Sequence, residues 1–398
     1  MELIATSTFG LEALVAEELK HLGYDKVVLE NGRVTFEADP IALCRANLWL
    51  RTSDRIRLKV GEFKAVTFDE LFEKTKALPW ADLIPVNAEF PVEGKSIKST
   101  LFSVPDCQAI VKKAVVESMK KKYKVEWFEE TGPMFKLEVA LLKDIATLTI
   151  DTSGPGLHKR GYRLQNTLAP LKETLAAAMV ILSKWNPDIT LVDPFCGSGT
   201  IPIEAALIGC NIAPGSNRSF ISEAWPILPK NLWQEARQET LDTAKKDCTL
   251  DILGYDIDGR AVRLARENAM KAKLGNLIHF QQQPLSDLSS KKKYGKTISN
   301  PPYGERLSEK QEVERLYKEM GKVFGKLDSW SHYVLTSHPD FEKLFGKTAS
   351  KKRKLYNGNI KVDYYQYYGP RPKHAHHNVS DEKTETAPET KAPSETEA

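Results

Sequence analysis

The chain has 398 residues, a formal net charge of +4, 41% hydrophobic residues and 28% charged residues. This length allows two or three domains, and no apolar run approaches the ~20 residues of a membrane span, so no transmembrane helix is expected. The N-terminus lacks the basic and apolar pattern of a signal peptide, so we expect a cytoplasmic location. Five scattered cysteines without metal-ligand spacing predict reduced, mostly buried thiols and no metal site.

The first 62 residues predict a small α+β domain. Residues 3–6 predict a strand, and apolar residues at helical spacing predict a helix over residues 11–19. Asn31-Gly32 favours a hairpin between two short strands. Basic and apolar residues alternate over residues 55–60, as expected of a half-buried strand.

Residues 63–155 predict a second α+β domain. Apolar residues recur on one face of a helix around residues 107–119, which also carries Lys112 and Lys113. Alternating apolar residues then predict two further strands between residues 135 and 150.

Residues 156–171 predict a linker, because glycine and proline interrupt the pattern immediately before it. Its cluster of basic and aromatic residues suits the phosphate backbone of a nucleic acid. From the local sequence alone, a solvated charged connector is an equal alternative. The candidates for nucleic-acid contacts in this segment are His158, Lys159, Arg160 and Arg163.

Residues 172–373 predict an α/β domain. Helices and apolar strands alternate, which indicates a mostly parallel sheet with helices on both faces. Asn357-Gly358 near the end predicts a closing antiparallel hairpin. Residues 374–398 are rich in Glu, Thr, Pro, Ala and Ser, and we expect a disordered acidic tail there.

A glycine-rich motif, DPFCGSGT, runs from Asp193 to Thr200 between an expected strand and helix. Its glycines allow a tight turn against a ligand, and the helix N-terminus suits a carboxylate. A P-loop is disfavoured because Gly-Lys-Thr is absent. The alternative is a simple tight turn, and Cys196 is expected to pack rather than to act as a nucleophile.

A second motif ends the next strand at Asp256, followed by Ile257 and Asp258. A carboxylate at that place can accept both hydroxyls of a ribose. A helix N-cap is the alternative, and Asp258 fits that role better because it lies nearer to the expected helix. An insertion at residues 211–250 separates the two motifs, and its tryptophans suggest packing of its own.

The third motif is Asn300-Pro301-Pro302-Tyr303, directly after an apolar strand. The prolines stiffen the loop, and Asn300 presents a carbonyl oxygen as an acceptor. Two such acceptors can hold an exocyclic amine with its lone pair toward a methyl donor, while Tyr303 stacks on an extruded base. The alternative is a rigid turn, but this tetrapeptide at a strand end favours amine binding.

The three motifs in this order resemble class I S-adenosylmethionine-dependent methyltransferases that act on amino groups, with a Rossmann-like catalytic domain. The resemblance implies that the glycine-rich turn holds the methionine part of the cofactor, Asp256 its ribose and Asp287 its adenine, although Pro284 stands near the place of the family's usual acid. Asn300, Pro301, Pro302 and Tyr303 would hold the target nitrogen. The implied cofactor residues are Asp193, Pro194, Cys196, Gly197, Ser198, Gly199, Thr200, Asp256, Ile257, Asp287 and Asn300.

The resemblance extends to the N-terminal half. Residues 1–62 resemble a ferredoxin-like domain, and residues 63–155, with the segment 93–99, resemble a THUMP RNA-binding domain. The segment 300–307 (NPPYGERL) is similar to that of the 23S ribosomal RNA guanine-N2 methyltransferase family. Implied RNA contacts are Lys98, Lys112, Lys113, His158, Lys159, Arg160 and Arg163.

The expected reaction is therefore methyl transfer to the N2 amine of a guanine in 23S ribosomal RNA, free or in an assembling large ribosomal subunit. Rival enzymes would methylate another base, such as a transfer RNA guanine or an adenine, or DNA or a protein glutamine. A rival of another class is a non-catalytic RNA-binding or ribosome assembly factor. The oligomeric state and the modified nucleotide stay open.

Overall fold

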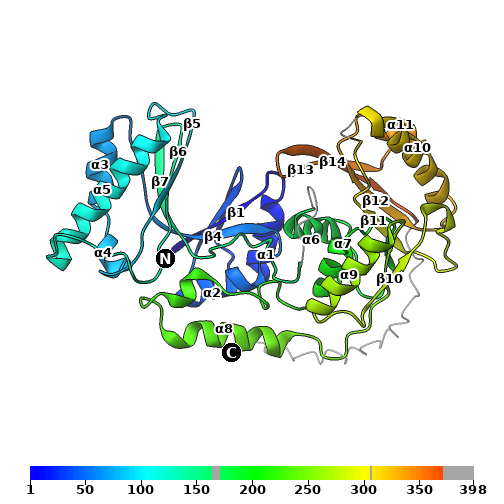
Figure 1. Cartoon of the computed structure of the whole chain (residues 1–398), viewed down its shortest axis with the longest axis horizontal. Coiled ribbons are helices and arrows are strands. Elements are labelled where there is room, and N and C mark those ends of the chain that lie inside the picture. The colour runs from blue at the N-terminus through cyan, green and yellow to red at the C-terminus, as the bar shows by residue number, and fades with distance from the viewer. Residues whose placement is uncertain (164–170, 305–306, 371–398) are drawn as a thin grey trace, which may run out of the picture.

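The computed structural model describes residues 1–163, 171–304 and 307–370, with side chains except those of residues 307–309. The tail expected over residues 374–398 lies outside this part of the chain. Two seven-stranded sheets form the centres of two units that lie side by side (Figure 1). Among the described residues, no helix is long and apolar enough to cross a membrane, and no three His, Cys, Asp or Glu side chains gather as metal ligands would.

The N-terminal unit is built on one continuous sheet. Its strands are β1 (Glu2–Ser7), β2 (Val27–Glu30), β3 (Arg33–Glu37), β4 (Ser53–Lys64), β5 (Val92–Ile97), β6 (Leu137–Leu142) and β7 (Ile145–Asp151). They are ordered β2-β3-β1-β4-β7-β6-β5. Strand β4 pairs with β1 through its first half and with β7 over most of its length. The boundary expected between residues 62 and 63 therefore lies inside a strand that both halves of the unit share.

Helices cover the N-terminal sheet: α1 (Glu12–His21), α2 (Pro40–Trp49), α3 (Phe68–Lys76), α4 (Trp80–Leu83) and α5 (Val104–Tyr123). Side chains fix two of their starts, since the Asp39 carboxylate accepts from Ala42 N and the Thr67 hydroxyl accepts from Glu70 N. The apolar face predicted for α5 is buried, from Cys107 to Met119. Its contacts with the sheet fix the orientation of this long helix.

The C-terminal unit holds the second sheet. Its strands are β8 (Leu191–Asp193), β9 (Ile252–Asp256), β10 (Ile278–Gln282), β11 (Lys296–Ser299), β12 (Ser331–Thr336), β13 (Lys351–Asn357) and β14 (Ile360–Tyr367). The order is β10-β9-β8-β11-β12-β14-β13, with parallel pairs from β10 to β12 and antiparallel pairs from there to β13. The predicted parallel sheet and closing hairpin are confirmed. The direction of winding reverses between β8 and β11, which is where ligands bind in open α/β sheets.

The helices of this unit are α6 (Glu173–Leu182), α7 (Thr200–Gly209), α8 (Lys230–Thr243), α9 (Gly259–Lys271), α10 (Leu307–Phe324) and α11 (Phe341–Phe345), with the short 3-10 turns η1 (Ile221–Ala224) and η2 (Leu285–Asp287). Helix α8 belongs to the insertion and lies beneath α2 of the N-terminal unit (Figure 1). The other long helices pack on the sheet itself.

The insertion between α7 and β9 packs on itself, where Phe220 stacks on Trp233 with 5.0 Å between centroids, and also into the other unit. Phe220, Trp225 and Trp233 belong to the same apolar core as the N-terminal sheet. The Trp225 ring stacks on Phe135 with 4.4 Å between centroids, and its indole N–H donates to the Met134 carbonyl at 2.9 Å. The insertion therefore joins the two units through buried aromatic contacts.

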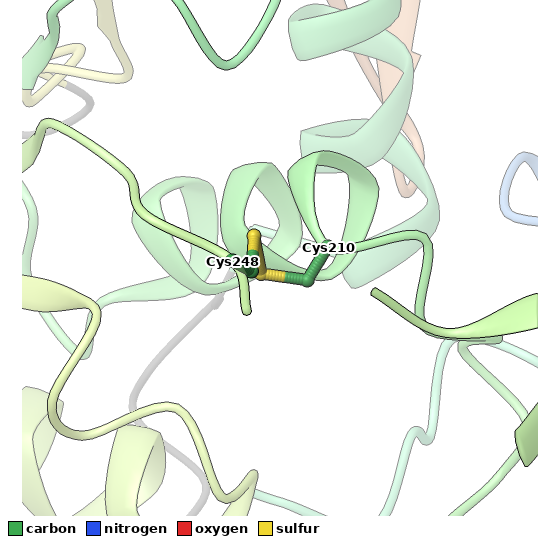
Figure 2. The surroundings of a disulfide bond; sticks show 2 residues. All are labelled: Cys210 and Cys248. Carbon is green, nitrogen blue, oxygen red and sulfur yellow. A yellow bond between two sulfur atoms is a disulfide. The ribbon is translucent and has the colours of Figure 1, made fainter. Parts of the chain in front are cut away.

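A disulfide closes the insertion. Cys210, at the end of α7, is bonded to Cys248, and their Cα atoms lie 5.5 Å apart (Figure 2). The expectation that all five cysteines are reduced is wrong for this pair. The other cysteines, Cys44, Cys107 and Cys196, are free and buried, as expected.

Candidate active site

A pocket of about 740 Å³ opens at the carboxyl ends of β8, β9 and β11, at the reversal point of the sheet. All three predicted motifs contribute to its wall: Pro194, Gly197, Asp256, Ile257, Asn300, Pro301, Pro302 and Tyr303. The rest of the lining is Phe195, Gln283, Pro284, Leu285, Gly304, Leu316, Glu319, Asn357 and Ile360. Residues more than 100 positions apart in the sequence therefore meet in one cavity.

The glycine-rich turn presents bare main chain to this pocket. Gly197 has φ +50°, and a Cβ added there would meet no atom within 4 Å. Gly199 has φ +82°, and an added Cβ would lie 3.0 Å from Ala265 and Phe280. Gly199 is also the N-cap of α7, and no side chain caps this helix. The first N–H groups of α7 are thus left without a side-chain acceptor, which suits an anionic group of a ligand.

The Asp256 carboxylate connects the first two motifs. One oxygen accepts from Gly197 N at 2.9 Å, and the other accepts from Asp258 N at 3.0 Å. Asp256 therefore holds the glycine-rich turn while its carboxylate lines the pocket. Asp258 caps α9 by accepting from Arg260 N, as the sequence favoured.

Asp193 lies behind the turn rather than in the pocket wall. Its side chain is buried and accepts from Phe195 N at 3.1 Å. Burial, with the charge of Asp256 nearby, raises the pKa of the Asp193 carboxyl well above its usual value. Asp193 therefore stabilises the conformation of the turn through this hydrogen bond and does not line the pocket.

The third motif is held by two tyrosine hydroxyls. Tyr303 donates to the Asn300 side-chain oxygen at 2.6 Å. Tyr317 of α10 donates to the Pro302 carbonyl at 2.7 Å and lies 2.8 Å from the Thr336 hydroxyl. Burial raises the pKa of Tyr317 to about 12, so its hydroxyl keeps its proton. The sequence did not indicate Tyr317, whose place on an apolar helix face looks like that of any core residue.

Several predicted cofactor residues do not line the pocket. Cys196 and Thr200 are buried in and after the turn, and burial raises the pKa of the Cys196 thiol, as expected of a packing residue. Ser198 and Gly199 lie in the turn outside the pocket lining. Asp287, proposed for the adenine, is exposed in η2 and lies outside the lining, where Gln283, Pro284 and Leu285 stand instead.

Two residues predicted to contact RNA, Arg160 and Arg163, form ion pairs within the protein instead. Arg160 is 3% exposed, forms an ion pair with the fully buried Glu204 at 3.3 Å, and donates to the carbonyls of Leu157 and Arg51. Arg163 pairs with Glu173 at 2.8 Å. The expectation that Arg160 contacts RNA is wrong, because its guanidinium is enclosed between the two units.

Arg163 instead supports the glycine-rich turn. Its guanidinium donates to the Thr200 hydroxyl at 3.1 Å and to the Leu171 carbonyl at 3.0 Å. Thr200 is the first residue of α7. The linker therefore contacts the start of the helix that follows the turn.

The other five predicted RNA residues divide by exposure. Lys98, Lys113 and Lys159 are exposed cations. Lys112 is held by Glu130 at 2.7 Å and lies over the Phe90 ring. Burial and neighbouring Lys172 and Lys159 lower the pKa of His158 to about 4, so this ring is neutral at neutral pH. It adds no positive charge for RNA.

Models of three protein families match the chain in order. The model described as RlmL ferredoxin-like domain matches residues 2–57, that of the THUMP domain matches residues 65–151, and the RMKL-like methyltransferase domain matches residues 160–366. The domain types expected from the motifs are confirmed.

Two curated relatives carry matching names. The chain is 58% identical over 368 residues to the "putative RNA methyltransferase YpsC" of Bacillus subtilis, covering 92% of this chain and 95% of that protein. It is 35% identical to the ribosomal RNA large subunit methyltransferase K/L of Syntrophotalea carbinolica, covering 90% of this chain. Only 52% of that second protein is covered, so this chain spans about half its length.

Solved structures agree on the fold and differ in the activity that they are named for. A protein of Listeria monocytogenes, described as a predicted N6-adenine-specific DNA methylase, has a TM-score of 0.89 at 58% identity and covers 93% of this chain and 96% of its own. SMU.472, described as "a putative methyltransferase complexed with SAH", has a TM-score of 0.89 at 49% identity and covers 94% of this chain and 99% of its own. The chain therefore belongs to the S-adenosylmethionine-dependent methyltransferases of the RMKL-like family, with RlmL ferredoxin-like and THUMP domains before its catalytic domain.

Proposed function

We propose that this protein methylates the exocyclic N2 amine of a guanine in 23S ribosomal RNA. The observation that carries the proposal is the meeting of Asn300, Tyr303, Gly197 and Asp256 in one pocket behind an RNA-type N-terminal unit. An amine acceptor and a cofactor cradle share this cavity. Direct transfer of the methyl group from the cofactor to the amine therefore needs no side chain that acts as a nucleophile.

The pocket fits S-adenosylmethionine. The open space over Gly197 admits a ligand against the main chain, and the uncapped start of α7 suits the carboxylate of the methionine part. Asp256 lines the same pocket and can accept the ribose hydroxyls. When bound, S-adenosylmethionine supplies an electrophilic methyl group on its sulfonium sulfur.

The chain's own residues bind and orient the base. The Asn300 side-chain oxygen and the Pro301 carbonyl accept the two N–H groups of the amine, which directs the nitrogen lone pair toward the cofactor side of the pocket. Tyr303 stacks on the extruded base. Tyr317 fixes the Pro302 carbonyl and so keeps the loop in one conformation. Positioning of this kind accounts for much of the rate of a bimolecular transfer.

The choice of RNA rests on the N-terminal unit and on one relative, and the choice of guanine rests on the resemblance of the segment 300–307. A THUMP domain precedes the catalytic domain, and the 35% identical relative is named for the large-subunit ribosomal RNA. The Listeria protein's name would instead suggest adenine N6 in DNA. Both amines suit an Asn-Pro-Pro-Tyr loop, so the product must be identified chemically.

The test is incubation with radiolabelled S-adenosylmethionine and ribosomal RNA from cells that lack the protein, as naked RNA and as particles. Label in N2-methylguanosine supports the proposal, whereas label in N6-methyladenosine, or no label in either RNA preparation, would reject it. The matched control is Asn300→Ala, which should lose methyl transfer and keep cofactor affinity. Equal losses of both would contradict the role given to Asn300.

A further inference from the structure

A strongly basic segment lies beside the pocket, and its basic residues have no part in the site described so far. From Lys343 to Lys361 the chain contains no acidic residue and seven basic ones: Lys343, Lys347, Lys351, Lys352, Arg353, Lys354 and Lys361. Four of them lie exposed on the hairpin β13–β14: Lys351, Lys352, Lys354 and Lys361. Strand β13 is the outermost strand of the second sheet, so within the described part of the chain one of its long sides faces no other strand.

The lysines of this hairpin are largely uncompensated. Lys352 lies 3.7 Å from Glu342, in a pair that is partly exposed. Lys351, Lys354 and Lys361 form no ion pair with any described residue, although Asp363 lies opposite Lys354 in the register. Three charges therefore remain available for an anionic partner.

The hairpin runs directly into the pocket. Asn357 and Ile360, the residues at its turn, are part of the pocket wall. Lys361 and Tyr356 lie opposite each other next to this turn. A strand that follows the lysines therefore reaches the place where Asn300 and Tyr303 would hold a base.

The hairpin also touches the N-terminal unit. Arg353 donates to the Gly10 carbonyl at 3.0 Å, and the ring of Phe9 meets that of Tyr356 edge-on, with 6.2 Å between centroids. Phe9 is 54% exposed. The hairpin therefore forms a bridge from the unit that contains the THUMP domain to the pocket. Figure 1 shows β13 reaching toward the N-terminal unit near β1. Aromatic rings next to cationic side chains are typical of single-stranded nucleic-acid surfaces.

We infer that the β13–β14 hairpin binds the backbone of the RNA strand that flanks the target base and directs it into the pocket. Lys351, Lys354 and Lys361 contact phosphates, and the Phe9–Tyr356 pair stacks on a neighbouring base. The inference rests on the proposed function for its substrate, but it concerns a surface that no motif identified. A single-stranded or looped RNA fits this short, basic, aromatic path better than a duplex does.

The test is the triple variant Lys351→Gln/Lys354→Gln/Lys361→Gln. For single strands the logarithm of the binding constant falls with the logarithm of the salt concentration, with a slope of about 0.7 per phosphate contact. The variant loses three contacts, so its slope should be smaller than that of wild type by about 2. At 0.15 M salt this corresponds to an RNA affinity that is about 50-fold weaker. Cofactor affinity and melting temperature should not change.

The matched control is Lys271→Gln/Lys291→Gln/Lys326→Gln. These lysines are also exposed and precede the starts of β10, β11 and β12, at the edge of the sheet opposite the pocket. Anisotropy with a labelled ribosomal RNA fragment measures binding in both variants, and methyl transfer measures the KM for RNA. A hairpin variant that binds RNA as tightly as the control would overturn the inference. A wild type that binds RNA through the hairpin but methylates none would contradict the proposed function alone.

Discussion

The hydrogen bond between Tyr303 and Asn300 predicts that removing one oxygen atom accelerates the reaction. In the structure the Tyr303 hydroxyl donates to the Asn300 oxygen at 2.6 Å. The target amine needs that same oxygen, so it has to displace the hydroxyl. Tyr303→Phe deletes the competing donor and keeps the ring for stacking.

The size of the effect follows from the bond that is lost. A neutral hydrogen bond contributes a net free energy of about 0.5–1.5 kcal/mol, and a factor of ten corresponds to about 1.4 kcal/mol. Tyr303→Phe should therefore raise kcat/KM for RNA by about 2- to 12-fold. Tyr303→Ala should lower it, because base stacking is worth about 1–3 kcal/mol.

The assay is methyl transfer at subsaturating RNA, with the cofactor Kd measured by calorimetry as the control. The cofactor Kd should be the same in wild type and in Tyr303→Phe. A fall in kcat/KM for Tyr303→Phe would refute the reasoning, since it would mean that the hydroxyl holds Asn300 in its working orientation or contacts the base.

Three further predictions concern binding, stability and oxidation state. Asp256→Ala removes a carboxylate that accepts from Gly197 N and lines the pocket. Two charged hydrogen bonds to the ribose, at about 1.5 kcal/mol each, would be lost, so the cofactor Kd measured by calorimetry should rise about 100-fold. An unchanged Kd would disprove the ribose role. Arg160→Ala leaves a buried carboxylate unpaired, which costs about 3–5 kcal/mol, so its melting temperature should fall by roughly 6 °C or more. The exposed Lys159→Ala should melt like wild type, and equal melting of both variants would contradict the buried pair. Thiol titration of the denatured, unreduced protein should find three thiols, because Cys210 and Cys248 are bonded; five would contradict the disulfide.

The pocket was largely predictable because its signals are local. Each motif follows a short apolar strand, and the carboxyl ends of parallel strands meet at one edge of a sheet. Gly197, Asp256 and Asn300 could therefore be placed together without knowledge of any long-range contact. The order of the domains was readable for the same reason.

The differences between sequence and structure at Arg160, at Cys210 and at β4 all involve partners that are distant in the sequence. Arg160 looked like an RNA contact because its partner Glu204, on α7, lies 44 residues further along the chain. The Cys210–Cys248 pair depends on how the insertion returns to the sheet. The long strand β4 joins two domains that the sequence separates, because strand pairing is decided by register and not by composition.

The KKRK run from Lys351 to Lys354 is a local sequence signal of the basic hairpin. The basic residues predicted to contact RNA lie elsewhere, near the linker and on the helix around Lys112. A run of basic residues on an edge strand indicates an RNA-binding surface only when the pocket beside it is known.

The aromatic contacts of the insertion bear on the order in which the protein is made and folded. Domains generally fold as they leave the ribosome, the N-terminal one first. Here the N-terminal core includes Phe220, Trp225 and Trp233, which are synthesised after the first strand of the catalytic sheet. The N-terminal unit therefore cannot complete its core during its own synthesis. The Phe135 ring stays uncovered until Trp225 has been synthesised and can stack on it. Neither unit can complete its packing without the other, so separating them at the linker would expose apolar surface on both units.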